Sequence, residues 1–154
     1  HHGGNDKAIY AYAREELDYW QSELSRPLAS GCFGENLTTQ GVDLSALLIN
    51  QRLRIGTAVL EVSVPRQPCS TFAGWLGERG WLKRWTARGD CGTYLRIISP
   101  GRIQPGDSIT MDTPPNHDIT MRIAFAAKMG NRTLAQRVIE AGCLPAHQHN
   151  NLRT

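Results

Sequence analysis

The sequence predicts a mainly β protein with helical inserts, in which a β-barrel-like core is followed by short C-terminal helices. Three observations lead to this prediction. The 154 residues include 15 Gly and 8 Pro, which favours a turn-rich fold over a helix bundle. Residues 58–64 alternate between apolar and polar side chains, as a half-buried strand does. Helical spacing of apolar residues occurs at residues 14–24, 119–129 and 133–141.

The expected elements follow one another along the chain. Residues 8–12 form either a strand or the lead into a helix, and the helix at 14–24 ends before Pro27, which cannot continue it. Residues 38–41 have the composition of a turn. Further strands are expected at 47–55, 58–64, 92–99 and 108–111. Two short helices, 71–76 and 82–86, are expected between them and carry Trp75, Trp81 and Trp85.

A boundary between two domains is predicted at Pro114 and Pro115. The barrel domain then covers residues 1–113 and a short helical appendage covers residues 116–154. Within the appendage, Thr133 is expected near the N-cap of its helix, and the polar tail 144–154 is expected to be loosely held. The chain enters its first glycine turn without an initiator Met or a linker, so we expect further strands of a longer protein to precede it.

Composition excludes several classes of protein. No stretch approaches the ~20 apolar residues that cross a bilayer, and no signal peptide is visible, so a cytoplasmic location without membrane association is expected. The net charge of +3 suits a small anionic ligand but is far from the basic stripe of a dedicated nucleic-acid binder. The cysteines have no C-x-x-C spacing, which argues against a zinc ribbon, and reduced thiols are expected. Packing is the favoured interpretation for Cys32, Cys91 and Cys143.

Cys69 is the residue whose local sequence most suits chemistry. It follows the strand predicted at 58–64, on a turn where Pro65 and Pro68 each fix φ at about −65° and limit the movement of the loop. Arg66 lies three positions earlier, and a neighbouring guanidinium favours the thiolate, the form that binds metals and attacks electrophiles. A buried structural thiol is the alternative, because cysteine is among the most buried residue types.

Two further segments have weaker signals for ligand binding. In the turn at residues 2–7, glycines let backbone N–H groups converge and Lys7 adds a charge for a phosphate, although a plain surface turn has the same composition. Glu35 and Asn36 follow a glycine and could bind the donors and acceptors of a heterocycle. A turn or a helix cap would explain the same two residues.

Two other clusters are better explained by structure than by chemistry. Cys143, His147 and His149 have the spacing of metal ligands, but they lie in a polar tail without a fourth ligand. The three tryptophans of the short helices could stack on a ligand, yet their spacing fits helix faces that pack on a sheet.

The order of these segments resembles the MOSC family, which is named after the C-terminal domain of molybdenum-cofactor sulfurases. The sequence HHGGNDKAIYAY comes first, FGENLTTQGVD follows a helix, VPRQPC ends a strand, and GTYLRIISPGRIQPGD comes last. Stand-alone YiiM-like members of this family carry an H-G-G-x-D-[KR]-A turn, an F-G-E-N-L segment and a P-R-x-P-C motif in the same order. They often end in a short three-helix appendage. The expected N-terminal strands of the family are absent from this sequence.

The resemblance implies a barrel that binds a molybdenum cofactor of the molybdopterin type, with Cys69 as the thiolate ligand of the metal. Arg66 would lie near the phosphate or the pyranopterin. The other residues that the resemblance places beside the cofactor are His2, Gly3, Gly4, Lys7, Glu35 and Asn36.

The same resemblance implies an activity. Related members reduce small N-hydroxylated compounds such as amidoximes and hydroxylamines, so we expect an oxidoreductase that is independent of pyridoxal phosphate. The sequence shows no haem, flavin or four-cysteine iron–sulfur motif, so turnover would need an external electron-donor protein of the reductase or ferredoxin-like type. The main alternative is a non-catalytic module that stores, delivers or sulfurates the cofactor through the same Cys69. A third reading is a domain that has kept the fold and lost its cofactor.

Overall fold

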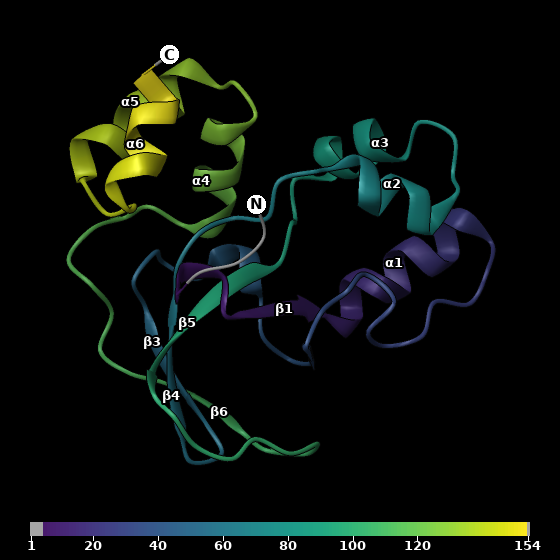
Figure 1. Ribbon diagram of the computed structural model, residues 1–154, viewed down its shortest axis with the longest axis horizontal. Coiled ribbons are helices and arrows are strands. Elements are labelled where there is room, and N and C mark those ends of the chain that lie inside the picture. Colours follow the sequence, from purple (N-terminus) through teal and green to yellow (C-terminus); the bar gives the residue numbers. More distant parts are fainter. Residues whose placement is uncertain (1–4, 154) are drawn as a thin grey trace.

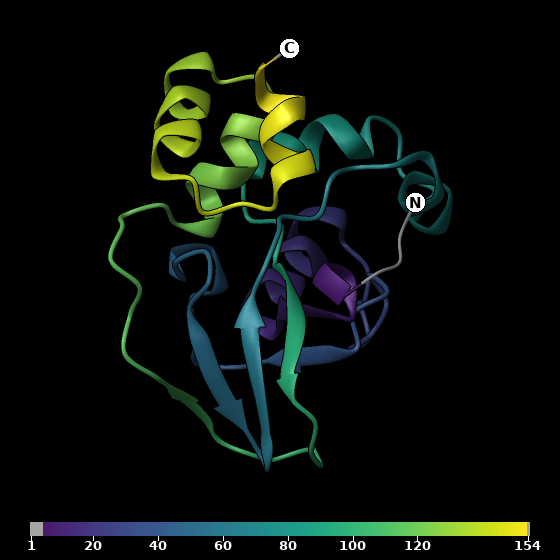
Figure 2. The same ribbon diagram turned by 60° about the vertical axis from the view of Figure 1, so that its left-hand side comes forward.

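A curled, six-stranded sheet forms the centre of the protein. The computed structural model describes residues 5–153. The strands lie in the order β2-β1-β5-β4-β3-β6, and every neighbouring pair is antiparallel except β1 and β2. The sheet curls into a half-barrel, and the helices gather at one end of it (Figures 1 and 2). This architecture confirms the predicted mainly β fold with helical inserts and C-terminal helices.

The elements have the following bounds. The strands are β1 (Ile9–Ala13), β2 (Leu37–Thr39), β3 (Arg52–Ile55), β4 (Ala58–Val62), β5 (Thr93–Ser99) and β6 (Ile109–Met111). The helices are α1 (Arg14–Leu24), α2 (Ser70–Leu76), α3 (Trp81–Arg88), α4 (Met121–Lys128), α5 (Arg132–Ala141) and α6 (Ala146–Arg153). Two short 3-10 helices are η1 (Asn5–Lys7) and η2 (Leu44–Ala46).

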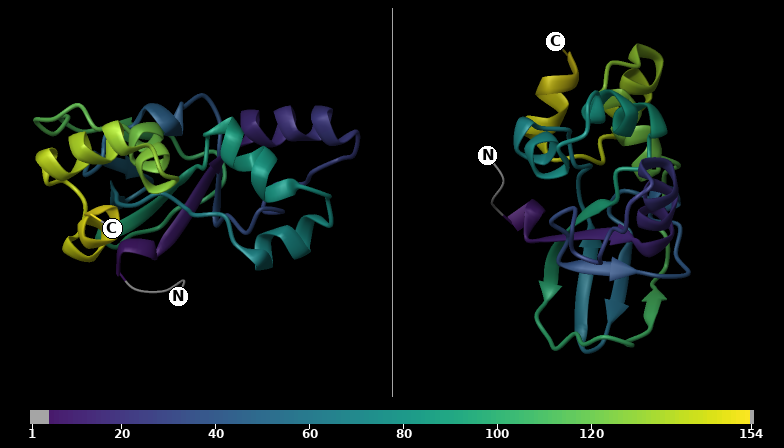
Figure 3. Two further views of the ribbon diagram at one scale, coloured as in Figure 1. Left: turned by 90° about the horizontal axis from the view of Figure 1, so that it is seen from above. Right: turned by 90° about the vertical axis from the view of Figure 1, so that its right-hand side faces the viewer.

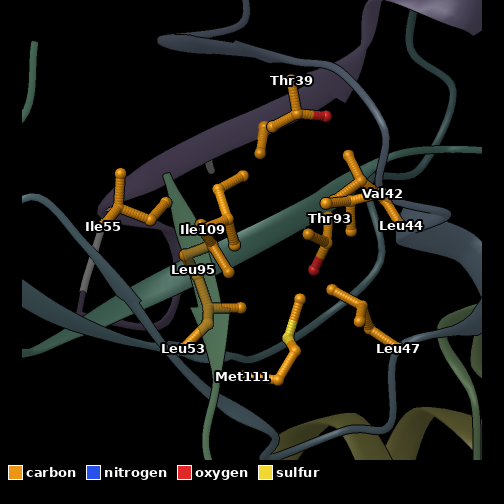
Figure 4. A pocket seen from close by; sticks show the side chains of 11 residues that line it. Thr39, Val42, Leu44, Leu47, Leu53, Ile55, Thr93, Leu95, Ile109 and Met111 are labelled. Carbon is orange, nitrogen blue, oxygen red and sulfur yellow. The ribbon is translucent and has the colours of Figure 1, made fainter. Parts of the chain in front are cut away.

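The hairpin of β3 and β4 shows why the sheet has one apolar face. Side chains in these strands alternate between buried and more exposed positions, and Leu53 pairs with Leu60 across the ladder. Their buried side chains point into the half-barrel, where they meet apolar groups from β5 and β6 (Figure 4). The space left among them is about 10 Å³. A volume of this size holds about one water molecule, so the interior of the half-barrel is packed core.

The helices form two groups around the end of the sheet that carries them. In Figure 1, α1, α2 and α3 lie on one side and α4, α5 and α6 on the other, and Figure 3 shows the same separation from above. Aromatic rings join the groups: Phe72 of α2 packs 5.1 Å from Trp85 of α3, and Trp85 packs 5.6 Å from Phe125 of α4, both edge-to-face. Such pairs contribute about 0.5–1.5 kcal/mol each beyond the apolar area that they bury.

Several local predictions were wrong. Residues 47–51 are not a regular strand, because the chain there follows η2 and makes only an isolated bridge at Leu48. A turn was expected at residues 38–41, but Thr38 and Thr39 belong to β2, which forms by pairing with the distant β1. The tail forms α6 with Gln148 buried, because the helix packs on α5 and α4. The N-cap of α5 is Asn131, whose side chain accepts a hydrogen bond from the N–H of Leu134.

The tryptophans divide between core and surface. Trp81 and Trp85 are buried as expected, but Trp75 is 58% exposed, so the core interpretation was wrong for that residue. All four cysteines are free thiols. Within residues 5–153, no helix has the length and apolar character needed to cross a membrane.

Candidate functional site

Cys69 stands where the loop after β4 enters α2. Its backbone is extended, with φ −143° and ψ 161°, and its carbonyl oxygen accepts the hydrogen bond from Ala73 that starts the helix. Pro65 is buried and Pro68 half-buried in the same loop, so the approach to Cys69 is stiffened on both sides of Arg66. The Cys69 side chain is half-buried and its thiol is free. The thiol is therefore held in position while still open to a ligand.

Tyr94 is electrostatically coupled to Cys69, and Lys7 lies near the ring of Tyr94. Tyr94 lies on β5, and its pKa is raised by burial and further by the nearby Cys69, while Arg66 acts in the opposite direction. The phenol therefore keeps its proton at neutral pH. The ammonium of Lys7, at the end of η1, lies 5.5 Å from the centroid of the Tyr94 ring. A cation at that distance is attracted to the face of an aromatic ring.

Lys128 brings a second ammonium group to the same region from the appendage. It is the last residue of α4, and its Nζ is buried without a hydrogen-bond partner among the residues that the structure describes. Burial lowers its pKa to about 8, and repulsion from Lys7 acts in the same direction. The two lysines are therefore close enough to repel each other. We call the region between η1 and α4 the seam.

A polar network fixes η1, and with it Lys7, against the sheet. Ser63 donates a hydrogen bond to the carbonyl oxygen of Asp6, and the Asp6 carboxylate pairs with Arg96 at 3.0 Å. Arg96 also donates to Asn50 at 3.1 Å and to Glu61 at 2.5 Å. Because charged hydrogen bonds of this kind are directional, the network sets the position of η1.

Glu35 and Asn36 hold the 31–37 loop in place. Glu35 is buried, and its two oxygens accept hydrogen bonds from the N–H of Phe33 at 3.0 Å and the hydroxyl of Thr38 at 3.1 Å. Asn36 pairs with β1 in both directions: its N–H donates to the carbonyl of Tyr10, and its side-chain oxygen accepts from the N–H of Tyr10, each at 2.8 Å. These contacts match the turn interpretation, and a role beside a cofactor stays a prediction.

Arg66 lies inside the molecule rather than on an open surface. Its guanidinium is 4.1 Å from the centroid of the Phe72 ring and 4.7 Å from that of Tyr10, and it donates a hydrogen bond to the carbonyl oxygen of Phe33. The side chain is buried. Arg66 thus joins the loop of Cys69 to the 31–37 loop, and its predicted contact with a cofactor has no test in this geometry.

The structure brings together some of the predicted site residues and adds others. Lys7 and Cys69 both lie near Tyr94, whereas Glu35 and Asn36 have protein partners of their own. His2, Gly3 and Gly4 lie outside the described residues. Sequence reasoning missed Tyr94 and Lys128. The available signal for Lys128 was a charged residue directly after the apolar run 123–127 of the helix.

A polar cavity of about 360 Å³ lies elsewhere, lined by the start of α1, residues 41–44 and the end of α3. Two ion pairs contribute to it: Arg88 with Glu16 at 2.9 Å and Arg122 with Asp90 at 3.8 Å. Burial raises the pKa of Asp90 to about 6, and the nearby Glu16 adds to the rise. Cys69 lines neither this cavity nor the apolar one inside the half-barrel. In the described part of the chain, no group of three or more His, Cys, Asp or Glu residues has the geometry to hold a metal ion.

Comparison with known proteins identifies the fold and its sequence family. The family model described as the MOSC domain matches residues 1–110. This chain belongs to the MOSC family. The MOSC family is associated with the molybdenum cofactor, and the resemblance found in the motifs of the sequence is thereby confirmed.

Among individual MOSC relatives, the chain is 36% identical over 146 residues to the uncharacterized protein YflK of Bacillus subtilis (strain 168), a match that covers 93% of this chain and 66% of YflK. It is 31% identical over 128 residues to the protein YiiM of Escherichia coli (strain K12), covering 81% of this chain and 57% of YiiM. The chain thus spans about two thirds or less of the length of these relatives.

Two other MOSC comparisons bear on activity and on fold. A protein of Gibberella moniliformis (strain M3125 / FGSC 7600) named reductase is 31% identical over 115 residues, which cover 71% of this chain and 20% of that protein. The crystal structure of YiiM from Geobacillus stearothermophilus superposes with a TM-score of 0.86 at 29% identity, covering 98% of this chain and 79% of that one. The half-barrel and the helices are therefore arranged as in that YiiM structure.

Proposed function

We propose that this MOSC protein binds a molybdenum cofactor of the molybdopterin type through the Cys69 thiolate and reduces small N-hydroxylated compounds. The observation that carries the proposal is the free, half-buried thiol of Cys69 near Tyr94, a residue whose ring also lies near the ammonium of Lys7. The Gibberella moniliformis relative named reductase supports an oxidoreductase, over one fifth of its own length. A cytoplasmic location and an external electron-donor protein of the reductase or ferredoxin-like type belong to the same proposal.

The residues present fit such a cofactor in kind. A thiolate is a soft, anionic ligand that suits a thiophilic metal, and Cys69 offers one on a stiffened loop. The cofactor carries a phosphate, and the buried Nζ of Lys128 has three N–H donors without a partner in the described chain. Lys7 would add a second positive charge on the barrel side of the same seam.

The roles of the residues follow from their positions. When bound, the cofactor would supply the two-electron chemistry that breaks the N–O bond of the substrate. Overall, an N-hydroxylated compound takes up two electrons from the donor protein and two protons, and its oxygen leaves as water. Tyr94 would keep its proton on Oη and donate a hydrogen bond to the substrate oxygen, because its raised pKa holds the phenol neutral. Lys7 would bind the anionic part of the cofactor.

Molybdenum content tests the first half of the proposal. Wild-type protein from a host that makes the cofactor should contain close to one molybdenum per chain, and Cys69→Ser should contain almost none. Cys32→Ser is the matched control, because Cys32 is also a free, half-buried thiol, and it should keep the metal. Molybdenum retained by Cys69→Ser would contradict the role of this thiol.

Catalytic turnover tests the second half of the proposal, the reduction of N-hydroxylated compounds. The metal-loaded wild type, supplied with a chemical reductant, should reduce a hydroxylamine or amidoxime. Tyr94→Phe should lower kcat by about 10²-fold, because the hydrogen bond to the substrate oxygen is lost. Metal binding without any reduction would leave the non-catalytic role of storing, delivering or sulfurating the cofactor. Absence of metal from wild type made in that host would favour a domain that has lost its cofactor.

A further inference from the structure

Lys128 is in an unusual environment for a lysine on a helix end. The Nζ atom is buried and has no hydrogen-bond partner within the described residues, although an ammonium carries three N–H donors. Burying a charged group without a partner is costly, and lysine is almost never buried unless it is paired. A buried group of this kind indicates a ligand, an ion or ordered water that completes its hydrogen bonds.

A second cation makes the environment less favourable still. Lys7 repels Lys128 across the seam, and Lys7 is itself held near Tyr94 by η1. Two ammonium groups near each other repel, and an anion bound by both of them would offset that repulsion. The polar network of Ser63, Asp6 and Arg96 holds η1, and so fixes the backbone from which the Lys7 side chain extends.

Lys128 and Lys7 belong to different parts of the protein, the C-terminal helices and the half-barrel. Lys128 ends α4, the helix that opens the C-terminal group, whereas Lys7 and Tyr94 belong to the sheet and its leading turn. The seam is tied from the other side as well, because the Asn50 side chain donates a hydrogen bond to the carbonyl oxygen of Cys143 at 3.0 Å. A ligand held by both lysines would therefore contact the barrel and the appendage at once.

From this geometry we infer that Lys128 and Lys7 together form a binding site for a phosphate dianion at the seam between the half-barrel and the C-terminal helices. The inference rests on the proposed function insofar as the phosphate is that of the cofactor, but the same chemistry would take a free phosphate. A dianion balances two ammonium charges, and its oxygens accept several hydrogen bonds at once. The appendage thus contributes directly to ligand binding through Lys128.

Direct binding of inorganic phosphate tests the inference on the full chain. Titration calorimetry at low ionic strength should show binding to wild type and at least tenfold weaker binding to Lys128→Gln. Lys83→Gln is the matched control: it removes one positive charge from the exposed face of α3, and it should bind phosphate as wild type does. Lys128→Arg should keep binding within a few-fold, because the charge and the donors remain.

Thermal stability separates a ligand site from a merely structural lysine. In phosphate-free buffer, Lys128→Met should melt at a higher temperature than wild type, because it removes an unpaired buried charge. Added phosphate should raise the Tm of wild type and leave that of Lys128→Met unchanged. Lys128→Gln that binds phosphate like wild type, or a folded wild type that binds none at millimolar concentration, would overturn the inference.

Molybdenum content then identifies the source of the phosphate. If the site holds the phosphate of the cofactor, Lys128→Gln made in a cofactor-producing host should contain markedly less molybdenum than Lys83→Gln. Loss of phosphate binding with full molybdenum content would show that the site takes free phosphate or a phosphorylated ligand. Wild type without molybdenum would contradict the proposed function alone, because the phosphate titration does not depend on the metal.

Discussion

The side-chain amide of Asn50 donates a hydrogen bond to the carbonyl oxygen of Cys143 and so joins the sheet to the chain between α5 and α6. Asn50 itself has a left-handed backbone, with φ +70°, which asparagine tolerates better than most residues. Its side-chain oxygen also accepts a hydrogen bond from Arg96. One residue therefore connects the network beneath η1 with the appendage.

Loss of the Asn50 side chain should loosen the appendage. Asn50→Gly keeps the backbone conformation accessible and removes both hydrogen bonds, so the free energy of unfolding should fall by about 1–3 kcal/mol. Amide hydrogen exchange should become faster in residues 143–149 than in the sheet. Asn116→Gly, at an exposed position, should change neither quantity. Uniform exchange across the protein in Asn50→Gly would contradict a local connection.

Arg66 should resist replacement even by lysine. Its planar guanidinium stacks on Phe72 and Tyr10, and lysine cannot reproduce that stacking or the hydrogen bond to Phe33 in the same geometry. Arg66→Lys should lower the free energy of unfolding by about 1–3 kcal/mol in urea denaturation, whereas Arg102→Lys at an exposed site should cost under about 0.5 kcal/mol. Equal stability of the two variants would show that the stacking contributes little.

Asp90 should make stability decrease as the pH rises. Burial raises its pKa to about 6 in the folded protein, whereas an unfolded Asp titrates at about 3.9, so the folded state binds this proton more tightly. Its contribution is fully present below the unfolded pKa and is lost as the pH rises through the folded value. Asp90→Asn should therefore be more stable than wild type by about 1–2 kcal/mol near pH 8, and this difference should shrink toward zero at about pH 4.

Urea denaturation across this pH range measures the effect of Asp90→Asn. Asp18→Asn is the control, because Asp18 is exposed and pairs with Arg14 on the surface of α1. A stability difference for Asp90→Asn that stays constant with pH would mean that the carboxyl does not titrate in that range.

Gly34 and Gly41 offer a matched pair for separating backbone strain from side-chain crowding. Both have positive φ, +84° and +79°, so alanine at either position should cost about 1–2 kcal/mol of stability. A Cβ at Gly34 would stand 2.8 Å from the ring of Trp75, while a Cβ at Gly41 would meet nothing within 4 Å. Because Trp75 is exposed and can turn aside, the two variants should lose similar stability. Only Gly34→Ala should shift the Trp75 fluorescence, and a much larger loss at Gly34 would show that the ring is fixed.

The sequence predicted the regular elements best where local patterns set them. The bounds expected for the first helix, residues 14–24, are those of α1, because its apolar spacing and Pro27 are both local signals. In contrast, β2 has three residues and exists because Leu37–Thr39 pairs with β1, which no local pattern indicates. The expected strand 47–55 was too long, because its first half folds over η2 before the ladder begins.

The residues of the candidate site were likewise predicted where local sequence signals exist and missed where distant contacts decide. Cys69 was singled out because prolines and a preceding strand are visible in the sequence, and the structure places a free thiol there. Lys128 was missed because Lys7, the cation that repels it, lies at the other end of the chain, and only the tertiary fold brings the two within electrostatic range. The contacts of Glu35 and Asn36 depend on loop geometry, which a sequence motif does not specify.

The pairing of β1 with β5 has a consequence for how the protein folds. Tyr10 lies opposite Tyr94, so the centre of the sheet closes only after most of the chain is available. Sheets built on such distant pairs fold slowly, because the entropy of closing a long loop is lost before the contacts form. Lys7, Tyr94 and Lys128 come from three widely separated parts of the sequence. The site they form is therefore assembled late, and a truncated or partly folded chain would keep the Cys69 loop without the lysines around it.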